Sequence, residues 1–290
     1  MTTDLALTSN SRSAYKMLRR ILRSPLGVIG MIIVGGALLC AIFAPQISPY
    51  DPMKGDISKL YVKEPSLQHP FGTDDAGRDI LSRVIYGAQI SLRIALLSEG
   101  GGLALGILVG LATGYYGGWL DALLMRIVDI FMAFPLLIIA IALAAALGAG
   151  EDKLIVALAL TIWPAVARLV RSQVLSLRES EYVSAARVIG ASDWRIMFRH
   201  ILPNILTPLI VFATLGVANV ILQEAALSFL GLGSSDPNAP SWGRMLNSSR
   251  QFLLAAPWMA FYPGLAILIA VLGFNLLGDA LRDALDIRTE

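Results

Sequence analysis

The sequence carries little charge for its length. Only 15% of its 290 residues are Asp, Glu, Lys or Arg, whereas apolar residues make up 56%. An ordinary soluble domain has about 25% charged residues, and a soluble chain of this length needs that charge to cover its surface. The composition therefore excludes a soluble protein and indicates a protein embedded in a lipid bilayer.

Cysteine and histidine are almost absent. Cys40 is the single cysteine and cannot form an internal disulfide. His69 and His200 are predicted on opposite sides of the membrane, so they cannot share a metal ion. The net charge is only +2, and no basic run alternates with aromatic residues as in nucleic-acid-binding proteins. We expect no metal site and no nucleic-acid partner.

Motifs for hydrolytic chemistry are also missing. No lysine follows a glycine, so the chain has no G-x-x-x-x-G-K-[ST] loop to hold the phosphates of ATP. It also lacks the G-x-S-x-G pattern that places a nucleophilic serine. We expect a non-enzymatic chain with no catalytic residues and no bound cofactor.

Long apolar runs dominate the sequence instead. A membrane-spanning helix needs about 20 mostly apolar residues. The runs do not alternate with a period of two, which favours helices over barrel strands. The sequence therefore predicts an all-α polytopic membrane protein with six transmembrane helices, at about 26–45, 88–113, 122–147, 154–174, 205–232 and 258–279.

The first run follows a basic N-terminal segment. A cleaved secretory signal also begins with basic residues, but its apolar core is only about 7–15 residues long. The run from Pro25 to Ala44 is longer. We expect a retained helix, with a cleaved signal as the alternative.

The placement of Lys and Arg predicts the orientation, because cytoplasmic loops carry an excess of both. The N-terminus and the segment between the fourth and fifth helices are rich in arginine, whereas the loop near Lys153 and residues 233–257 are not. We therefore expect both termini in the cytoplasm. The predicted divisions are a cytoplasmic segment 1–24, a first helix 25–45, an extracytoplasmic segment 46–87, a five-helix core 88–282 with a cytoplasmic loop 175–204, and a cytoplasmic tail 283–290.

Glycine recurs every four residues in the second predicted helix. The spacing puts four residues without a side chain on one helix face, so that a neighbouring backbone can approach closely. We expect helix packing rather than phosphate binding at this stripe, which consists of Gly102, Gly106, Gly110 and Gly114.

The loop 175–204 has a helix–turn–helix pattern. Residues 179–189 favour a helix, which Gly190 can end in the left-handed conformation. Ser192 can then cap a second helix. Ala185 and Ala186 are expected to form a narrow surface that suits insertion into a partner's groove. An amphipathic loop lying on membrane lipid is the alternative.

The second of these helices is predicted to be amphipathic. It places Trp194, Met197, Phe198 and Ile201 on one face and arginines on another. Pro203 is expected to mark the turn into the fifth membrane helix.

This segment resembles the E-A-A-x3-G-x9-I-x-L-P loop of bacterial ABC-importer permeases. Ala185, Ala186, Gly190, Leu202 and Pro203 match that pattern in register, whereas Ser184 stands at the Glu position and His200 at the Ile position. The resemblance implies that the segment docks on an ATPase subunit, through Glu181, Tyr182, Ser184, Ala185, Ala186, Arg187, Gly190, Ala191 and Ser192.

A second block is similar to the GTD-x-x-GRD-x-x-SR signature of one permease subunit of dipeptide, oligopeptide, glutathione and nickel importers. This block spans residues 71–92, and the blocks 226–233 and 274–286 match the same subunit type. The resemblance covers about residues 15–286 and implies the fold of a type I ABC importer permease in the bacterial inner membrane.

The resemblance also implies an assembly. A second related permease subunit completes the pore, two ATPase subunits bind ATP and Mg, and an extracytoplasmic substrate-binding protein delivers the cargo. We expect dipeptides or oligopeptides as cargo, with nickel or glutathione as the alternative. Two functions of a different class stay open as alternatives: an ATP-independent carrier or channel, and a membrane scaffold. A carrier should show inverted repeats and broken helices, and no clear pair of these is visible in the sequence.

A few charged residues interrupt the apolar runs, where charge is costly and usually functional. Arg126 and Asp129 lie three apart on one helix and are expected to neutralise each other. Glu224 either faces the pathway or bonds to a neighbouring helix. Glu99 either contacts cargo, or makes an interhelical bond or a kink beside Gly100.

Overall fold

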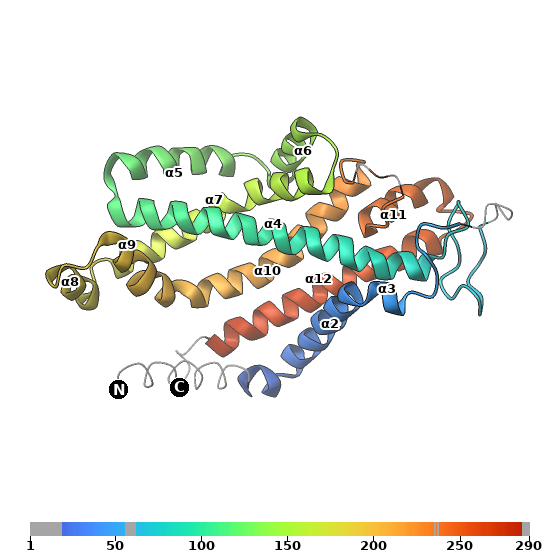
Figure 1. Ribbon diagram of the computed structural model, residues 1–290, viewed down its shortest axis with the longest axis horizontal. Coiled ribbons are helices and arrows are strands. Elements are labelled where there is room, and N and C mark those ends of the chain that lie inside the picture. The colour runs from blue at the N-terminus through green and yellow to red at the C-terminus, as the bar shows by residue number, and fades with distance from the viewer. Residues whose placement is uncertain (1–18, 56–61, 235, 237, 286–290) are drawn as a thin grey trace.

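The chain forms a long helical bundle (Figure 1). The computed structural model describes residues 19–55, 62–234, 236 and 238–285. It confirms the all-α polytopic fold, because five helices are long and apolar enough to cross a membrane: α2 (Pro25–Ile42), α4 (Ile80–Tyr116), α7 (Glu151–Leu177), the continuous helix Asp193–Phe229 that contains α10 (Leu202–Phe229), and α12 (Trp258–Leu285).

The third predicted helix is broken into two. α5 (Gly118–Met132) and α6 (Leu136–Leu147) are bent by 97° relative to each other, so the single helix expected over 122–147 is wrong. Pro135 stands at the break; it lacks an N–H group and disfavours the helical conformation of the residue before it. This break is therefore predictable from the proline in the sequence.

Two further boundaries differ from expectation. α4 begins at Ile80, because the side chain of Asp79 accepts a hydrogen bond from the Ser82 N–H and caps the helix. Residues 80–87 are therefore helical. The turn expected at Pro203 is also wrong, since the helix runs through it after the π-helical segment η2 (Ile196–Ile201). Pro203 lies at the junction of η2 and α10, inside this continuous helix.

The predicted glycine stripe of α4 packs against α7. Gly102, Gly106, Gly110 and Gly114 lie opposite Ile162, Val166, Val170 and Val174, in that order. A Cβ atom added at Gly106 would lie 2.5 Å from the Cβ of Val166. Both residue numbers rise together along the interface, so α4 and α7 run in the same direction. The α5–α6 pair must therefore carry the chain back across the membrane between the end of α4 and the start of α7. Counted as one crossing, it brings the number of membrane crossings to six.

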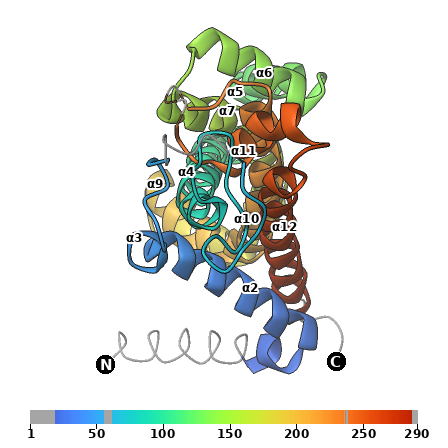
Figure 2. The ribbon, with the colours of Figure 1, turned by 90° about the vertical axis from the view of Figure 1, so that its right-hand side faces the viewer.

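The remaining helices surround this pair. Figure 2 shows α2 and the α5–α6 pair on opposite sides of a central group made of α4, α7, α10 and α12. α10 runs antiparallel to α4, because Glu224 meets Ser91 and Glu99 meets Gly216. Gly27 and Gly30 of α2 lie against Ala280 and Leu277 of α12.

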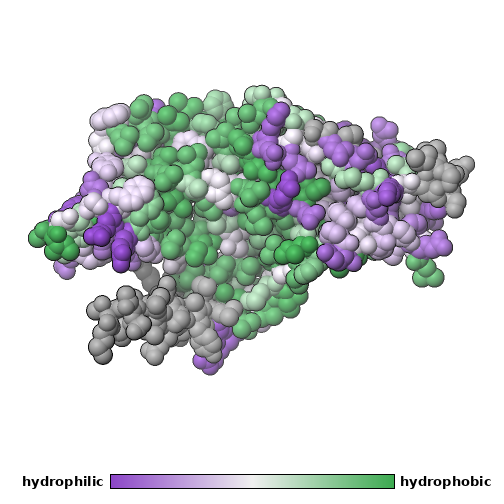
Figure 3. Space-filling model, in the orientation of Figure 1, coloured by the Kyte–Doolittle hydropathy of each residue, from purple (hydrophilic) through white to green (hydrophobic). Residues whose placement is uncertain are grey.

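The surface divides into three parts along the long axis. Figure 3 shows an apolar band in the middle and hydrophilic residues at the two ends. One end carries α8 (Glu181–Val188) and α9 (Asp193–Arg195), and we call it the α8 end. The other end carries residues 48–55 and 62–79 and α11 (Trp242–Ser249), and we call it the α11 end.

We predict that Gly106→Ala destabilises the bundle by about 1–3 kcal/mol, because the added methyl group overpacks the α4–α7 interface. Gly100→Ala on the same helix is the matched control: no atom lies within 4 Å of its added Cβ. That substitution should be neutral or slightly stabilising, since Ala favours a helix by about 1 kcal/mol over Gly. Thermal unfolding of both variants in one detergent checks this, and equal midpoints would contradict the packing described.

Candidate functional site: the α8 segment

The first half of the α8 segment, residues 175–204, ends as predicted in a glycine turn. Gly190 has φ +81°, in the left-handed region. The N–H of Ala191 donates to the carbonyl of Ala186, and the N–H of Gly190 donates to that of Arg187, both at 3.0 Å. This pair of bonds satisfies the last carbonyls of α8. The predicted helix end is confirmed.

The second half begins at the predicted cap. The Ser192 hydroxyl accepts from the N–H of Arg195 at 3.4 Å, at the start of α9 and η2. The expected apolar face is divided: Met197 and Ile201 are buried, whereas Trp194 is exposed and its ring centroid lies 4.0 Å from that of Phe198, with the two rings tilted by 32°. Only part of this face therefore belongs to the core.

The exposed surface of α8 differs from the expected one. Ala186 is buried and packs inward, so Ala185 alone represents the expected alanine surface. Within the α8 segment, the most exposed apolar residues are Val188 at 87% and Ile189 at 83%, directly before the glycine turn. Sequence reasoning missed both, although two apolar residues beside a helix-ending glycine are a visible signal. The other expected docking residues are exposed except Ala191, which is partly buried: Glu181, Tyr182, Ser184, Arg187, Gly190 and Ser192.

The α8 segment is fastened to the end of α4. The Tyr115 hydroxyl donates to the Asp193 carboxylate at 2.8 Å, and the Arg187 guanidinium lies over the Tyr115 ring, 5.4 Å from its centroid. Arg178 also donates to the carbonyl of Gly114 at 3.2 Å. The α8 segment is therefore in direct contact with a membrane-spanning helix.

Ion pairs join α5 to α7 near this end. Arg171 donates to both carboxylate oxygens of Asp121, at 2.6 and 2.7 Å. Asp129 pairs with Arg168 of α7, so the expected pairing of Arg126 with Asp129 is wrong. An arginine on a facing helix reaches this carboxylate, and a pattern within one helix cannot show that neighbour.

The two candidate pathway carboxylates have different surroundings. Glu224 is fully buried and accepts hydrogen bonds from Ser91 at 2.9 Å and Ser228 at 2.7 Å. Glu99 is only 3% exposed, and its Oε1 has no hydrogen-bond partner among the described residues. α4 continues without interruption past Glu99, so there is no break there. Contact of either group with cargo stays a prediction.

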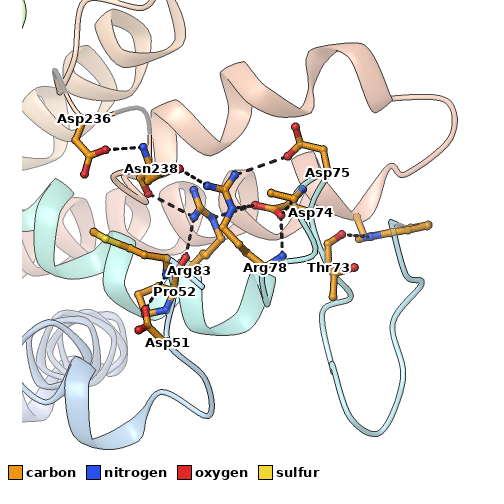
Figure 4. Close-up of polar contacts among 12 residues, drawn as sticks. Asp51, Pro52, Thr73, Asp74, Asp75, Arg78, Arg83, Asp236 and Asn238 are labelled. Carbon is orange, nitrogen blue, oxygen red and sulfur yellow. Dashed lines mark hydrogen bonds and ion pairs between the residues drawn. The ribbon is translucent and has the colours of Figure 1, made fainter. Parts of the chain in front are cut away.

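The GTD-x-x-GRD block forms a polar network at the α11 end (Figure 4). The Asp74 carboxylate accepts from Arg78 Nε at 2.7 Å and pairs with Arg83 Nε at 3.4 Å. Arg78 also donates to the side chain of Asn238 at 2.8 Å, and Arg83 to the carbonyl of Pro52 at 2.8 Å. The network joins residues 48–55 and 62–79, the first turn of α4 and the loop before α11.

Comparison with protein families agrees with this architecture. Residues 102–290 match the family described as binding-protein-dependent transport system inner membrane component. The chain belongs to this family of ABC-importer permeases. Residues 15–70 match a second family, the N-terminal TM domain of oligopeptide transport permease C. The predicted pore-forming role and the multi-pass inner-membrane location are confirmed, and the family implies ATPase and substrate-binding partners.

Individual relatives cover nearly the whole chain. It is 47% identical over 275 residues to the dipeptide transport system permease protein DppC of Alkalihalophilus pseudofirmus, covering 95% of this chain and 89% of that protein. It is 46% identical over 272 residues to the glutathione transport system permease protein GsiD of Escherichia coli O6:K15:H31, covering 94% and 89%. The resemblance seen in the motifs is thereby confirmed.

We predict that Asp74→Ala destabilises the protein by about 3–5 kcal/mol, because it leaves two buried guanidinium groups without their shared carboxylate. Asp75→Ala is the matched control: its side chain is 42% exposed and lies 3.7 Å from Arg78. An exposed ion pair contributes about 1 kcal/mol or less. Thermal unfolding of both variants checks this, and an equal loss from both would show that Asp74 does not organise the network.

Proposed function

We propose that this chain and a second related permease subunit together form the pore of an importer for short peptides. Two ATPase subunits would bind ATP and Mg on their own chains and power the cycle, while this chain binds no cofactor. The observation that carries the proposal is the α8 segment, which exposes Val188 and Ile189 at a helix end fastened to α4. Exposed apolar side chains of this kind mark a protein interaction site.

The proposed function also sets the orientation of the chain in the membrane. The α8 end would lie in the cytoplasm, where the excess of arginine in residues 175–204 favours it. The α11 end, with the Asp74 network, would then face the substrate-binding protein outside. Cargo delivered there would enter between the two permease subunits.

The packing supports a lever mechanism. Closure of the ATPases on ATP would displace α8, and the Tyr115–Asp193 and Arg178–Gly114 bonds would pass this displacement to α4. Because the glycine stripe holds α4 against α7, and ion pairs hold α7 to α5, these helices would move together. Such a concerted movement would expose the pathway to one side of the membrane and then to the other.

Two relatives bear on the choice of cargo. A dipeptide permease and a glutathione permease are nearly equally similar to this chain. Glutathione is itself a tripeptide, so both point to short peptides. Glutathione is the second candidate cargo.

Purification of the chain from its native membrane in mild detergent tests the assembly. We expect a second permease and ATPase subunits to co-purify, and their reconstitution with the binding protein to import a labelled dipeptide only when ATP is supplied. Uptake of glutathione but not of the dipeptide would identify glutathione as the cargo. A chain that purifies alone in several detergents, or uptake without ATP, would contradict the proposal.

We predict that Gly190→Trp prevents association with the ATPase, because its bulky ring would stand at the turn beside the exposed tip of α8. Gly190→Ala is the matched control: no atom lies within 4 Å of its added Cβ, and both variants have the same strain of about 1–2 kcal/mol at positive φ. The amount of ATPase that co-purifies with each variant measures the effect. Equal amounts would show that this turn does not enter the interface.

A further inference from the structure

An open groove lies between the glycine turn and η2 at the α8 end. Its volume is about 370 Å³, and it is lined by Ile189, Gly190, Ala191, Arg195, Arg199 and His200. Three of these six residues have basic side chains and none is acidic. The groove is therefore a concave, positively charged surface beside the exposed Val188–Ile189 tip.

The guanidinium groups in this groove lack a partner within the described part of the chain. No ion pair or hydrogen bond joins the guanidinium group of Arg195 or Arg199 to any described residue. The nearby acids are engaged elsewhere: Asp193 accepts from Tyr115, and Glu179 pairs with Arg178. Glu181 stands at the opposite end of α8 from the turn.

The π-helical segment accounts for the grouping of the basic side chains. In η2 the hydrogen bonds run from residue i to i+5, which widens the turn compared with an α-helix. Arg195, Arg199 and His200, four and five residues apart, therefore line one groove. π segments are energetically unfavourable and occur frequently at functional sites.

The charge of the segment also departs from the family pattern in one direction. Ser184 stands where the pattern has an acidic residue, and His200 stands where it has an apolar one. The first departure removes a negative charge from α8, and the second places a basic side chain in the groove.

We propose that the groove binds a carboxylate, an Asp or Glu side chain on the surface of the ATPase subunit, next to the apolar contact of Val188 and Ile189. A guanidinium fork matches a carboxylate through two parallel hydrogen bonds. This inference rests on the proposed function, since it requires an ATPase at the α8 end. It names the chemistry that the ATPase must present.

The position of the groove favours a protein partner over a lipid headgroup. Figure 1 shows α8 and its turn projecting beyond the end of α4 along the long axis. The apolar band lies nearer the middle of the molecule along the same axis (Figure 3). Because the α8 segment extends past the apolar band, its groove is accessible to a partner in the aqueous phase.

Carbodiimide coupling tests the inference on the whole complex. The reagent joins an amine and a carboxylate in direct contact as an amide, with loss of water and no spacer. Arg195→Lys and Arg199→Lys place such an amine in the groove while keeping its charge. We expect at least one of them to couple to an Asp or Glu of the ATPase, identified by mass spectrometry of the linked peptides.

Arg282→Lys is the matched control, because Arg282 is an exposed arginine of α12 and does not line the groove. It should give no link to the ATPase. If the ATPase co-purifies but neither groove lysine couples to it, or if they couple to the serine carboxylate of phosphatidylserine, the inference is wrong and the proposed function stands. If no ATPase co-purifies with the unaltered chain, both are wrong.

Charge reversal gives a second measurement. Arg199→Glu should weaken binding of the ATPase at least about tenfold, because like charges would then meet in the interface. Arg282→Glu should leave the affinity unchanged. Raising the salt concentration should weaken the unaltered complex more than the Arg199→Glu complex. The same salt dependence for both would overturn the inference.

Discussion

The contact of α4 with α7 is the constraint on which the rest of the structure depends. Four glycines on α4 leave no side chains on one face, and the branched residues of α7 fill the space. In a bilayer there is no hydrophobic gain from bringing two helices together, so close packing of this kind supplies the attraction. It fixes α4 and α7 as a parallel pair, which in turn requires the bent α5–α6 pair to cross the membrane between them.

Polar contacts at both ends of the bundle include α4. At the α8 end, Tyr115 and Gly114 of α4 hold the α8 segment. At the other end, the Asp74 network surrounds the first turn of α4 through Arg83. α4 thus has an attachment at each of its ends, and a rigid helix 37 residues long connects them. One element therefore joins the proposed ATPase contact to the proposed entrance for cargo.

Local features were predictable from the sequence, and contacts between helices were not. The Gly190 turn and the Ser192 cap follow from the conformational preferences of single residues, and the glycine stripe follows from a simple period. The break at Pro135 could have been predicted from the same rules. By contrast, the pairing of Asp129 with Arg168 joins residues 39 apart on two helices, and no local pattern shows it. The helical period places the arginines of residues 193–201 on one face, but the wider turn of η2, with His200 beside them in the groove, does not follow from that period.

The two interfaces of α4 differ in how well their polar groups are satisfied. Against α7, the glycine stripe of α4 meets close-packed branched apolar residues, and Arg93 of α4 pairs with Glu151 of α7 at 2.6 Å. Against α10, it places the Glu99 carboxyl beside Gly216, with Oε1 unpaired among the described residues, while Ser91 and Glu224 satisfy each other two turns away. An unpaired buried oxygen costs free energy that a hydrogen bond would recover. The α4–α10 interface thus holds an unsatisfied buried oxygen, whereas the glycine face of α4 against α7 is apolar and closely packed.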